Sequence, residues 1–539
     1  MSSCIRDSSD NRRDLHDRLA AFPGKRAGTA ALHTVHRRAE REAINIHRYK
    51  SGTRAALVPL ISEKNKTAAA HGSRKERYMA NIKKYIGSKA FYRSVLAVAV
   101  PIMIQNGITN FVSLLDNIMV GRLGTEVMSG VSIVNQLLFV LQLLLFGAVS
   151  AAGIFTAQYH GTGNTDGVRY TFRFKIIVNI LTAAVGIAIF LCFGDGLISL
   201  FLHADGSGAD TALTLAEGKK YLLAALFGLI PYALSQAYSS TLRETGSAMI
   251  PMVASIAAVV TNFCLNLILI FGLLGAPRLG AVGAAIATVT SRFVELAVLA
   301  VWTHKNKLRC PFAVGAFRSL YIPGHLVREI TIKGMPLMLN EGLWVFGMTF
   351  RNQIYSGAGL TVVAAQNICL TVAEVFDIVY KSLGSAIAII LGNHLGAGRI
   401  EEAKDANRKM IAFSMCCTVV ISGLLIALSP LFPRIYNTTD EVRSLATFMI
   451  IITAAATPFA AFGYCSYFTL RSGGKILVTM LFDSIFMCFF VAPLAYLLMN
   501  IVGLEIHTAF VIVTFTDIIK ALIGYLLLRR GDWTNKLVE

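Results

Sequence analysis

Charged residues are scarce in this chain, and acidic ones are the scarcer kind. Only 15% of the 539 residues are Asp, Glu, Lys or Arg, whereas 55% are hydrophobic, and the mean hydropathy is +0.60. Soluble domains carry about 25% charged residues, so this composition excludes an ordinary soluble protein and favours one with several membrane spans. Acids number 31 against 50 Lys and Arg, which leaves a formal net charge of +19.

This positive excess does not indicate a protein that binds nucleic acid. Residues 1–80 hold 17 Lys and Arg against 8 Asp and Glu, so about half of the excess lies in one terminal stretch. The stretch has no apolar run long enough for a signal peptide or a span, and it has almost no aromatic residues that could stack on bases. We therefore expect residues 1–85 to be a basic, disordered extension, and Met79 is a plausible alternative start.

The sequence also lacks the patterns of a metal or catalytic centre. No nucleophile–base pair emerges from the apolar segments, and no Cys-x-x-Cys pair or histidine cluster suggests a zinc site or a disulfide framework. We therefore expect neither an enzyme nor a bound cofactor. Seven of the nine cysteines fall within apolar stretches and are expected to pack between helices: Cys192, Cys264, Cys369, Cys416, Cys417, Cys465 and Cys488.

Two glycine pairs spaced as Gly-x-Gly resemble a phosphate loop only superficially. Gly161 and Gly163 lie in one copy, and Gly396 and Gly398 in the other, with no preceding strand and no following Gly-Lys-Ser/Thr. The pairs are therefore expected to end helices, where a positive φ favours glycine.

What the chain does contain is an internal repeat. Residues 101–124 and 336–359 match at a Pro, a Met, two Gly and an Asn, each pair 235 residues apart. The two glycine pairs keep the same offset, and the segments TLRETG (241–246) and TLRSGG (469–474) match at an offset of 228. Two homologous halves in a strongly apolar chain are typical of secondary transporters.

Apolar stretches of about 20 residues recur twelve times after residue 90, which predicts twelve spans. The spans are centred near Gln105, Val140, Val185, Leu229, Val260, Arg292, Trp344, Asp377, Val419, Ala454, Phe486 and Phe515. Basic residues gather in alternate connections and at both ends, so the positive-inside rule places both termini in the cytoplasm.

The predicted fold is an all-α polytopic membrane protein, with twelve transmembrane helices in two six-helix lobes related by the repeat. The N-lobe, spans 1–6, would occupy residues 86–305 and the C-lobe, spans 7–12, residues 329–539, joined by a cytoplasmic linker over 306–328. Because a six-span unit begins and ends on the same side, the axis relating the lobes should lie along the membrane normal, with a cavity between them.

Several segments at matching spacing resemble the multidrug and toxic compound extrusion family. They are LLDNIMVGRLG (114–124), LRETG followed by Pro251, NFCLNLILIFG (262–272), GAAIAT (283–288) and HLGAGR (394–399). The resemblance implies an antiporter of the bacterial inner membrane that exports amphipathic, often cationic, organic compounds against H⁺ or Na⁺ by alternating access. We accordingly expect small organic substrates and membrane lipids as partners, no nucleic acid, no cofactor beyond the coupling ion, and a monomer.

Asp116 is the candidate coupling residue. A carboxylate inside a membrane span costs several kcal/mol unless it faces a cavity or a partner. The resemblance makes Asp116 the cation-linked carboxylate of the N-lobe, with Asn262, Asn266 and Thr288 as companions. The two asparagines, four residues apart, share one helical face, and the four side chains offer oxygen ligands suited to Na⁺.

One departure from the family pattern affects this site. Asn266 stands where the family would have Asp, so only one anionic ligand is present, which weakens Na⁺ binding and favours proton coupling through Asp116. Two structural alternatives stay open: Asp116 could reach the membrane interface or cap the turn beside Arg122, and the asparagines could simply join helices by hydrogen bonds.

The second lobe has diverged in charge. The 235-residue offset aligns Asp116 with Arg351 and Asn106 with Glu341. Glu341 matches a glutamate that some family members use for the cation or the substrate. The acid that those members carry in span 10 is missing near Ala460, which argues against a complete second Na⁺ site.

Span 8 carries a polar stripe, in which Glu374, Asp377 and Lys381 are three and four residues apart. Lys381 is expected to pair with Asp377, which leaves Glu374 either free or paired with Arg351. The stripe is either a neutralised network that joins spans 7 and 8, or a cavity wall whose remaining negative charge selects cations.

Three further charged groups lie within the spans; two are expected to be structural ion pairs and one has no assigned role. Arg292 with Glu295, and Asp517 with Lys520, are spaced as ion pairs on their helices, and Asp483 has no evident partner.

Three rival functions are weaker. A flippase for lipid-linked oligosaccharides should line its cavity with several cations, whereas most membrane cations here have a carboxylate three or four residues away. A receptor or scaffold would not need carboxylates within both lobes, and an enzyme has no candidate centre.

Overall fold

The computed structural model describes residues 84–201 and 211–538, and these residues form helices joined by short connections. The predicted basic extension and Met79 lie outside the described residues, apart from the last two positions of residues 1–85. Several helices begin at a residue whose side chain accepts a hydrogen bond from the backbone. Ser88 accepts from Phe91 N, Asn164 from Gly167 N and Thr439 from Val442 N. These are the N-cap residues that satisfy otherwise unpaired backbone N–H groups.

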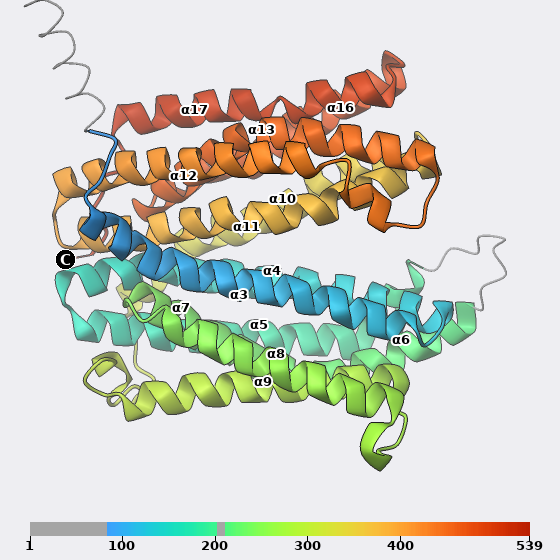
Figure 1. Ribbon diagram of the computed structural model, residues 1–539. Helices are drawn as coiled ribbons and strands as arrows, with labels where there is room; N and C mark the ends of the chain where they lie inside the picture. The colour runs from blue at the N-terminus through green and yellow to red at the C-terminus, as the bar shows by residue number, and fades with distance from the viewer. Residues whose placement is uncertain (1–83, 202–210, 539) are drawn as a thin grey trace, which may run out of the picture. The chain divides into compact units, whose positions relative to one another are not determined.

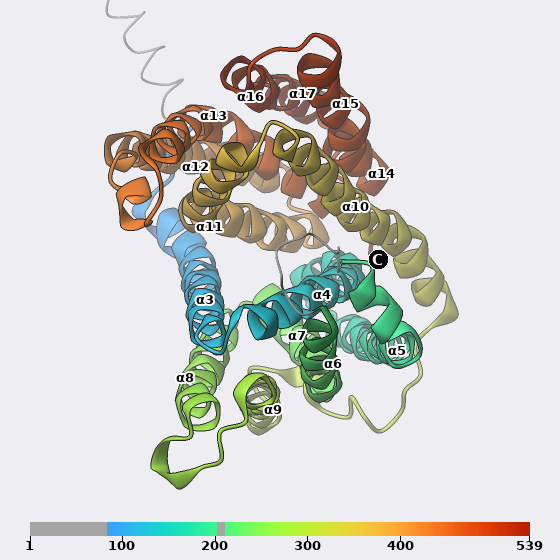
Figure 2. The same ribbon diagram turned by 90° about the vertical axis from the view of Figure 1, so that its right-hand side faces the viewer.

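The helices fall into two lobes (Figures 1 and 2). The N-lobe contains α3 (Lys89–Gly121), α4 (Thr125–Thr162), α5 (Thr165–Ser199), α6 (Thr211–Leu226), α7 (Leu229–Glu244), α8 (Met249–Phe271) and α9 (Gly280–Lys305). The C-lobe contains α10 (Gly324–Ser356), α11 (Leu360–Gly396), α12 (Ile400–Leu428), α13 (Asp440–Ser472), α14 (Ile476–Met480), α15 (Ala492–Tyr496), α16 (Ile506–Thr514) and α17 (Asp517–Arg530). Three π-helical segments continue α14 and α15 as far as Ile501.

The number of spans is roughly consistent with the twelve predicted. Within residues 84–201 and 211–538, ten segments are long and apolar enough to cross a membrane, and α6 with α7, bent by 48° at a short break, makes an eleventh. The helix α10, with 33 residues, is long enough to cross a membrane and corresponds to α3 in the repeat, but it is less apolar than the other spans. The chain is therefore an integral membrane protein of two six-helix lobes.

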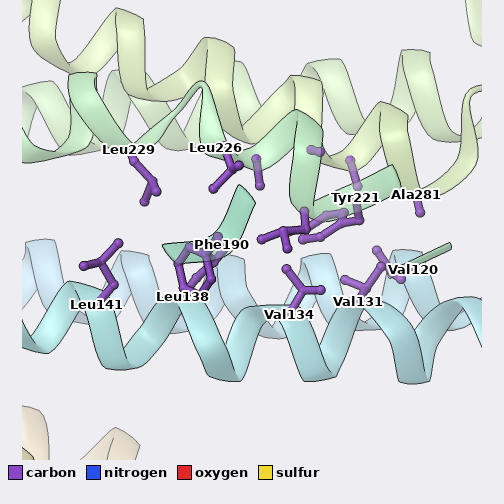
Figure 3. Packing of buried hydrophobic residues seen from close by; sticks show 14 of the residues in the cluster. Val120, Val131, Val134, Leu138, Leu141, Phe190, Tyr221, Leu226, Leu229 and Ala281 are labelled. Carbon is purple, nitrogen blue, oxygen red and sulfur yellow. The ribbon is translucent and has the colours of Figure 1, made fainter. Parts of the chain in front are cut away.

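Each lobe has its own apolar core. In the N-lobe, side chains from α4, α5, α6 and α7 interdigitate, among them Val134, Leu138, Phe190 and Leu226 (Figure 3). The C-lobe core involves α10, α11, α13 and the π-helical stretch. The cysteine prediction is wrong in part: Cys192, Cys264 and Cys416 are exposed on the helix surfaces instead of packed between helices.

The lobes touch where α4 and α11, which are equivalent in the repeat, cross near their C-terminal ends. A Cβ added to Gly161 would lie 2.1 Å from the carbonyl oxygen of Asn393, and one added to Gly396 would lie 2.0 Å from that of Gln158. Only glycine permits this backbone approach. All four paired glycines lie at helix ends, as predicted, but only Gly163 and Gly398 have the positive φ angles expected there, 77° and 73°. Gly161 and Gly396 are still helical, and the close approach of the two backbones explains why they are glycines.

Residues 531–538, which we call the C-terminal strap, join the two lobes at the same end of the bundle. Gln158, fully buried on α4, donates to the carbonyl oxygens of Ser472 (3.1 Å) and Asn535 (3.3 Å). Its own Oε1 accepts from the backbone N of Leu537 at 2.7 Å. The side chain of Trp533 packs in a cluster of C-lobe residues and α3, while Val538 packs with residues of α4. One N-lobe side chain thus holds the end of the C-lobe.

Candidate functional site

The four predicted coupling residues meet in one line of hydrogen bonds. Asn266 donates to Asp116 Oδ1 at 2.6 Å and to Asn262 Oδ1 at 3.1 Å, and Asn262 donates to Thr288 Oγ1 at 3.2 Å. The line runs from α3 through α8 to α9. It forms because the two asparagines share one face of α8, which packs between α3 and α9.

The carboxylate of Asp116 has no cationic partner within ion-pair distance among the described residues. Arg292, one turn beyond Thr288 on α9, binds Glu295 at 3.0 Å and lies over the ring of Tyr232, with 4.8 Å to its centroid. The prediction that Arg292 and Glu295 form a pair is confirmed. Asp116 therefore carries a charge that only an amide hydrogen bond and more distant cations compensate.

Asp116 faces a cavity of about 470 Å³ that is lined mainly by N-lobe residues and that we call the N-lobe cavity. The cavity also exposes neutral polar side chains, including Gln105, Asn106, Asn262 and Thr288. A carboxylate, amide oxygens and a hydroxyl around such a space match the oxygen ligands that hard cations prefer. Asn266 adds one specific feature, because its Oδ1 is buried without any hydrogen-bond donor, as a ligand atom for a cation would be.

The predicted C-lobe residues line a second cavity of about 440 Å³: Glu341, Arg351, Glu374, Asp377 and Lys381. Lys381 binds Asp377 at 3.3 Å, as predicted. Glu374 is exposed and forms no ion pair with Arg351 within the described part of the chain, so the free state is the observed one. Glu374 and Lys381 also line the N-lobe cavity, so the two spaces adjoin.

One charge prediction in the C-lobe, the pair of Asp517 with Lys520, is wrong, and the unexplained Asp483 has a partner. Lys520 binds Asp483 at 2.5 Å instead of forming an ion pair with Asp517. Asp483, which had no evident partner, also accepts a hydrogen bond from Asn340 at 3.3 Å. The pairing joins a π-helical segment to α17, and spacing along one helix does not reveal a partner on another.

Two cations at the lobe boundary, Arg471, which is buried, and Arg243, which is half-buried, were not predicted from the sequence. Arg243 and Arg471 occupy equivalent positions in TLRETG and TLRSGG, and both side chains reach cavities. The signal was present, since the two segments were recognised as a repeat, but the arginines in them were not considered as a site.

The family model MatE matches the chain twice, over residues 101–268 and 336–497, which together cover more than half of its length. The chain belongs to the MATE transporter family. The two matches follow the repeat, with one in each lobe.

Curated relatives of this MATE protein are distant but nearly full-length. A protein named "Probable multidrug resistance protein NorM" from Thermotoga maritima is 24% identical over 450 residues, covering 83% of this chain and 94% of that protein. "Probable multidrug resistance protein YoeA" from Bacillus subtilis is 26% identical over 448 residues, covering 80% and 90%. Both relatives are named as multidrug resistance proteins.

Solved structures share the fold of this MATE protein. One described as the outward-facing conformation of a multidrug resistance MATE family transporter has a TM-score of 0.74 at 18% identity, covering 84% of this chain and 97% of that one. A Pyrococcus furiosus transporter of the same superfamily, whose description reports a binding pocket of reversed polarity, also has a TM-score of 0.74 at 18% identity, with the same coverage. At such identity the likeness concerns the fold alone.

Proposed function

We propose that this MATE chain exports amphipathic organic cations across a bacterial inner membrane in exchange for H⁺ or Na⁺. The observation that supports the proposal most directly is the line of hydrogen bonds that ends at Asp116 beside a 470 Å³ cavity. A membrane carboxylate without a cationic partner is expensive to maintain, and such groups mark ion pathways.

In this proposal the coupling ion is a substrate that occupies the Asp116 site once in each cycle. Na⁺ would bind to the carboxylate of Asp116, to Thr288 Oγ1 and to amide oxygens, of which Asn266 Oδ1 is already free. A proton would instead neutralise Asp116 directly, and the single anionic ligand favours this alternative.

The organic cation would follow the two adjoining cavities. Glu374 is exposed on their shared wall and, like Glu341 of the C-lobe cavity, has no ion-pair partner within the described residues, so these carboxylates can attract a positive charge. Aromatic walls such as Trp344 and Phe146 offer flat apolar surfaces and cation–π contacts.

Exchange follows from linkage between the two occupants. If the coupling ion favours one orientation of the lobes and the organic cation favours the other, binding of each promotes release of the other, with equal and reciprocal coupling free energy. The remaining elements of the proposal are a monomer and a cytoplasmic location for both termini, the latter on the strength of the basic connections.

The test is ethidium efflux from proteoliposomes under either a Na⁺ gradient or a pH gradient alone. The parent is compared with Asp116→Asn, which keeps the shape of the side chain and removes its charge. Asp195→Asn is the matched control, because Asp195 is an exposed surface carboxylate paired with Lys219 at 2.6 Å.

We expect efflux to be driven by one gradient, lost in Asp116→Asn and retained in Asp195→Asn. Full efflux in Asp116→Asn would move coupling to Glu341 and contradict the role of the N-lobe site. No efflux from the parent under either gradient would contradict cation export and make the oligosaccharide flippase the next candidate.

A further inference from the structure

A separate small cavity of about 120 Å³ lies at the boundary between the lobes. Its wall contains repeat-related pairs: Ser150 with Ser385, 235 residues apart, and Arg243 with Arg471, 228 apart. Because both members of each pair face the same space, the cavity lies where the two halves of the repeat meet. We call it the boundary cavity.

Arg471 of α13 is a buried cation with incomplete hydrogen bonding. The residue is only 4% exposed, and its Nη1 is buried without an acceptor. Its guanidinium carbon lies 5.3 Å from the ring centroid of Phe468, 5.8 Å from that of Tyr467 and 6.0 Å from that of Phe146. Aromatic faces attract the guanidinium but do not accept its N–H groups as a carboxylate would.

Arg243 of α7 also lacks a strong hydrogen-bond acceptor. Among the described residues, its side chain donates one hydrogen bond, from Nη1 to the neutral Oε1 of Gln105, at a long 3.4 Å. Within residues 84–201 and 211–538, neither Arg243 nor Arg471 has a carboxylate oxygen within 4 Å. Glu341, on the wall of the C-lobe cavity, acts on Arg471 only at longer range.

The acid closest in sequence is already neutralised. Glu244, next to Arg243, forms a buried ion pair with Lys175 and accepts a hydrogen bond from Ser240 at 2.5 Å. Its repeat equivalent beside Arg471 is Ser472, so the C-lobe supplies no carboxylate at the matching position. The boundary cavity is therefore lined by two arginines, and its one acid, Glu244, is already paired with Lys175.

We propose that the boundary cavity binds the carboxylate group of an organic acid or zwitterion between Arg243 and Arg471. The planar guanidinium forks can each donate two parallel hydrogen bonds to a carboxylate, which would give Arg471 Nη1 the acceptor that it lacks. Bringing one arginine from each lobe to one anion would also make occupancy sensitive to how the lobes are oriented.

This site extends the range of compounds beyond cations, and only its role in transport rests on the proposed export function. Compounds that carry both a delocalised cation and a carboxylate could place the cation near Glu374 and the carboxylate in the boundary cavity, since Phe146 lines all three spaces.

The binding test uses the purified full-length protein and two probes of equal shape, benzoate and its neutral analogue benzamide. A ligand that binds only the folded protein raises its thermal unfolding temperature. The variants are Arg243→Gln, which removes a cation, and Arg471→Lys, which keeps the charge of the more buried residue and loses the fork. Arg408→Gln is the matched control, because Arg408 is exposed on α12 and has no ion-pair partner in the described residues.

We expect benzoate, and not benzamide, to stabilise the parent and the Arg408→Gln protein. The apparent affinity for benzoate should fall about 10- to 100-fold in Arg243→Gln, the loss expected when a charged hydrogen bond is removed. Arg471→Lys should give a smaller loss. Equal stabilisation by both probes, none by either, or undiminished benzoate affinity in Arg243→Gln would overturn the site.

A transport measurement separates this site from the proposed function. Tetramethylrhodamine and its methyl ester share one cationic ring system and differ in whether the carboxylate is free. We expect the ratio of acid to ester export to fall about tenfold in Arg243→Gln. Export of the ester alone would support cation export and oppose the anion site. Benzoate binding without export of either dye would support the anion site and oppose cation export.

Discussion

Replacing Gln158 with alanine would release the C-terminal strap from the N-lobe. The substitution removes three hydrogen bonds, two to carbonyl oxygens and one from the backbone N of Leu537. At about 1 kcal/mol for each bond, the strap should lose about 3 kcal/mol of its resistance to local opening. That free energy corresponds to a roughly 100-fold larger open population, since each 1.4 kcal/mol is a factor of ten.

Hydrogen–deuterium exchange of the full-length protein measures this opening directly. Amides of residues 531–538 should exchange about 100 times faster in Gln158→Ala, because exchange from a folded segment reports the free energy of local opening. Amides in the core of α5 should be unchanged. Gln353→Ala is the control, since Gln353 is exposed on α10 and its side chain has no hydrogen-bond partner in the described part of the chain.

Two results would refute this reasoning. Unchanged exchange of the strap in Gln158→Ala would mean that burial of Trp533 and Val538, which are 3% and 5% exposed, holds the strap without Gln158. Equal acceleration in Gln353→Ala would mean that the effect is not local.

Two further predictions concern a buried ion pair and a buried thiol. Lys175→Met should destabilise the protein by about 3–5 kcal/mol in thermal or denaturant unfolding, because Glu244 is left buried without its cation. Adding Glu244→Gln to Lys175→Met should recover much of the lost stability. A double variant no more stable than the single one would contradict this. Burial raises the pKa of Cys310, in the connection after α9, to about 11, with a smaller opposing effect of Arg309. The thiolate is therefore scarce at pH 8, so maleimide labelling of Cys310, scored by mass spectrometry, should be slow there and rise steadily toward pH 11. Labelling that is already at its maximal rate at pH 8 would contradict this.

The fold was predictable because its signals are local or repeated. Twelve apolar stretches and an offset of 235 residues suffice to predict two six-helix lobes, since a membrane requires each span to satisfy its own backbone hydrogen bonds. The details that failed depend on contacts between distant segments. The sequence predicts a positive φ angle at Gly161 and Gly396 because they lie at helix ends, whereas the crossing of α4 and α11 is what requires glycine there.

The candidate site was predictable where its residues share a helix. Asn262 and Asn266 lie four apart on α8, and Lys381 pairs with Asp377 four residues away. Partners on different helices were not predictable from spacing: Asp483 meets Lys520 across 37 residues of sequence, and nothing in either segment indicates the other. The meeting of Asp116 with Asn266 was expected only because of the family resemblance. The C-terminal strap is the extreme case, because the partners Gln158 and Leu537 are 379 residues apart.

The contact between the backbones of α4 and α11 also offers a means of controlling the protein. Neither Gly161 nor Gly396 has room for even one additional carbon while the helices touch. A bulky residue introduced there would act as a wedge, stable only in an arrangement that separates this end of the lobes. Glycine crossings of this kind thus provide a genetic route to trapping a transporter in the opposite orientation for structure determination, without an inhibitor or an antibody.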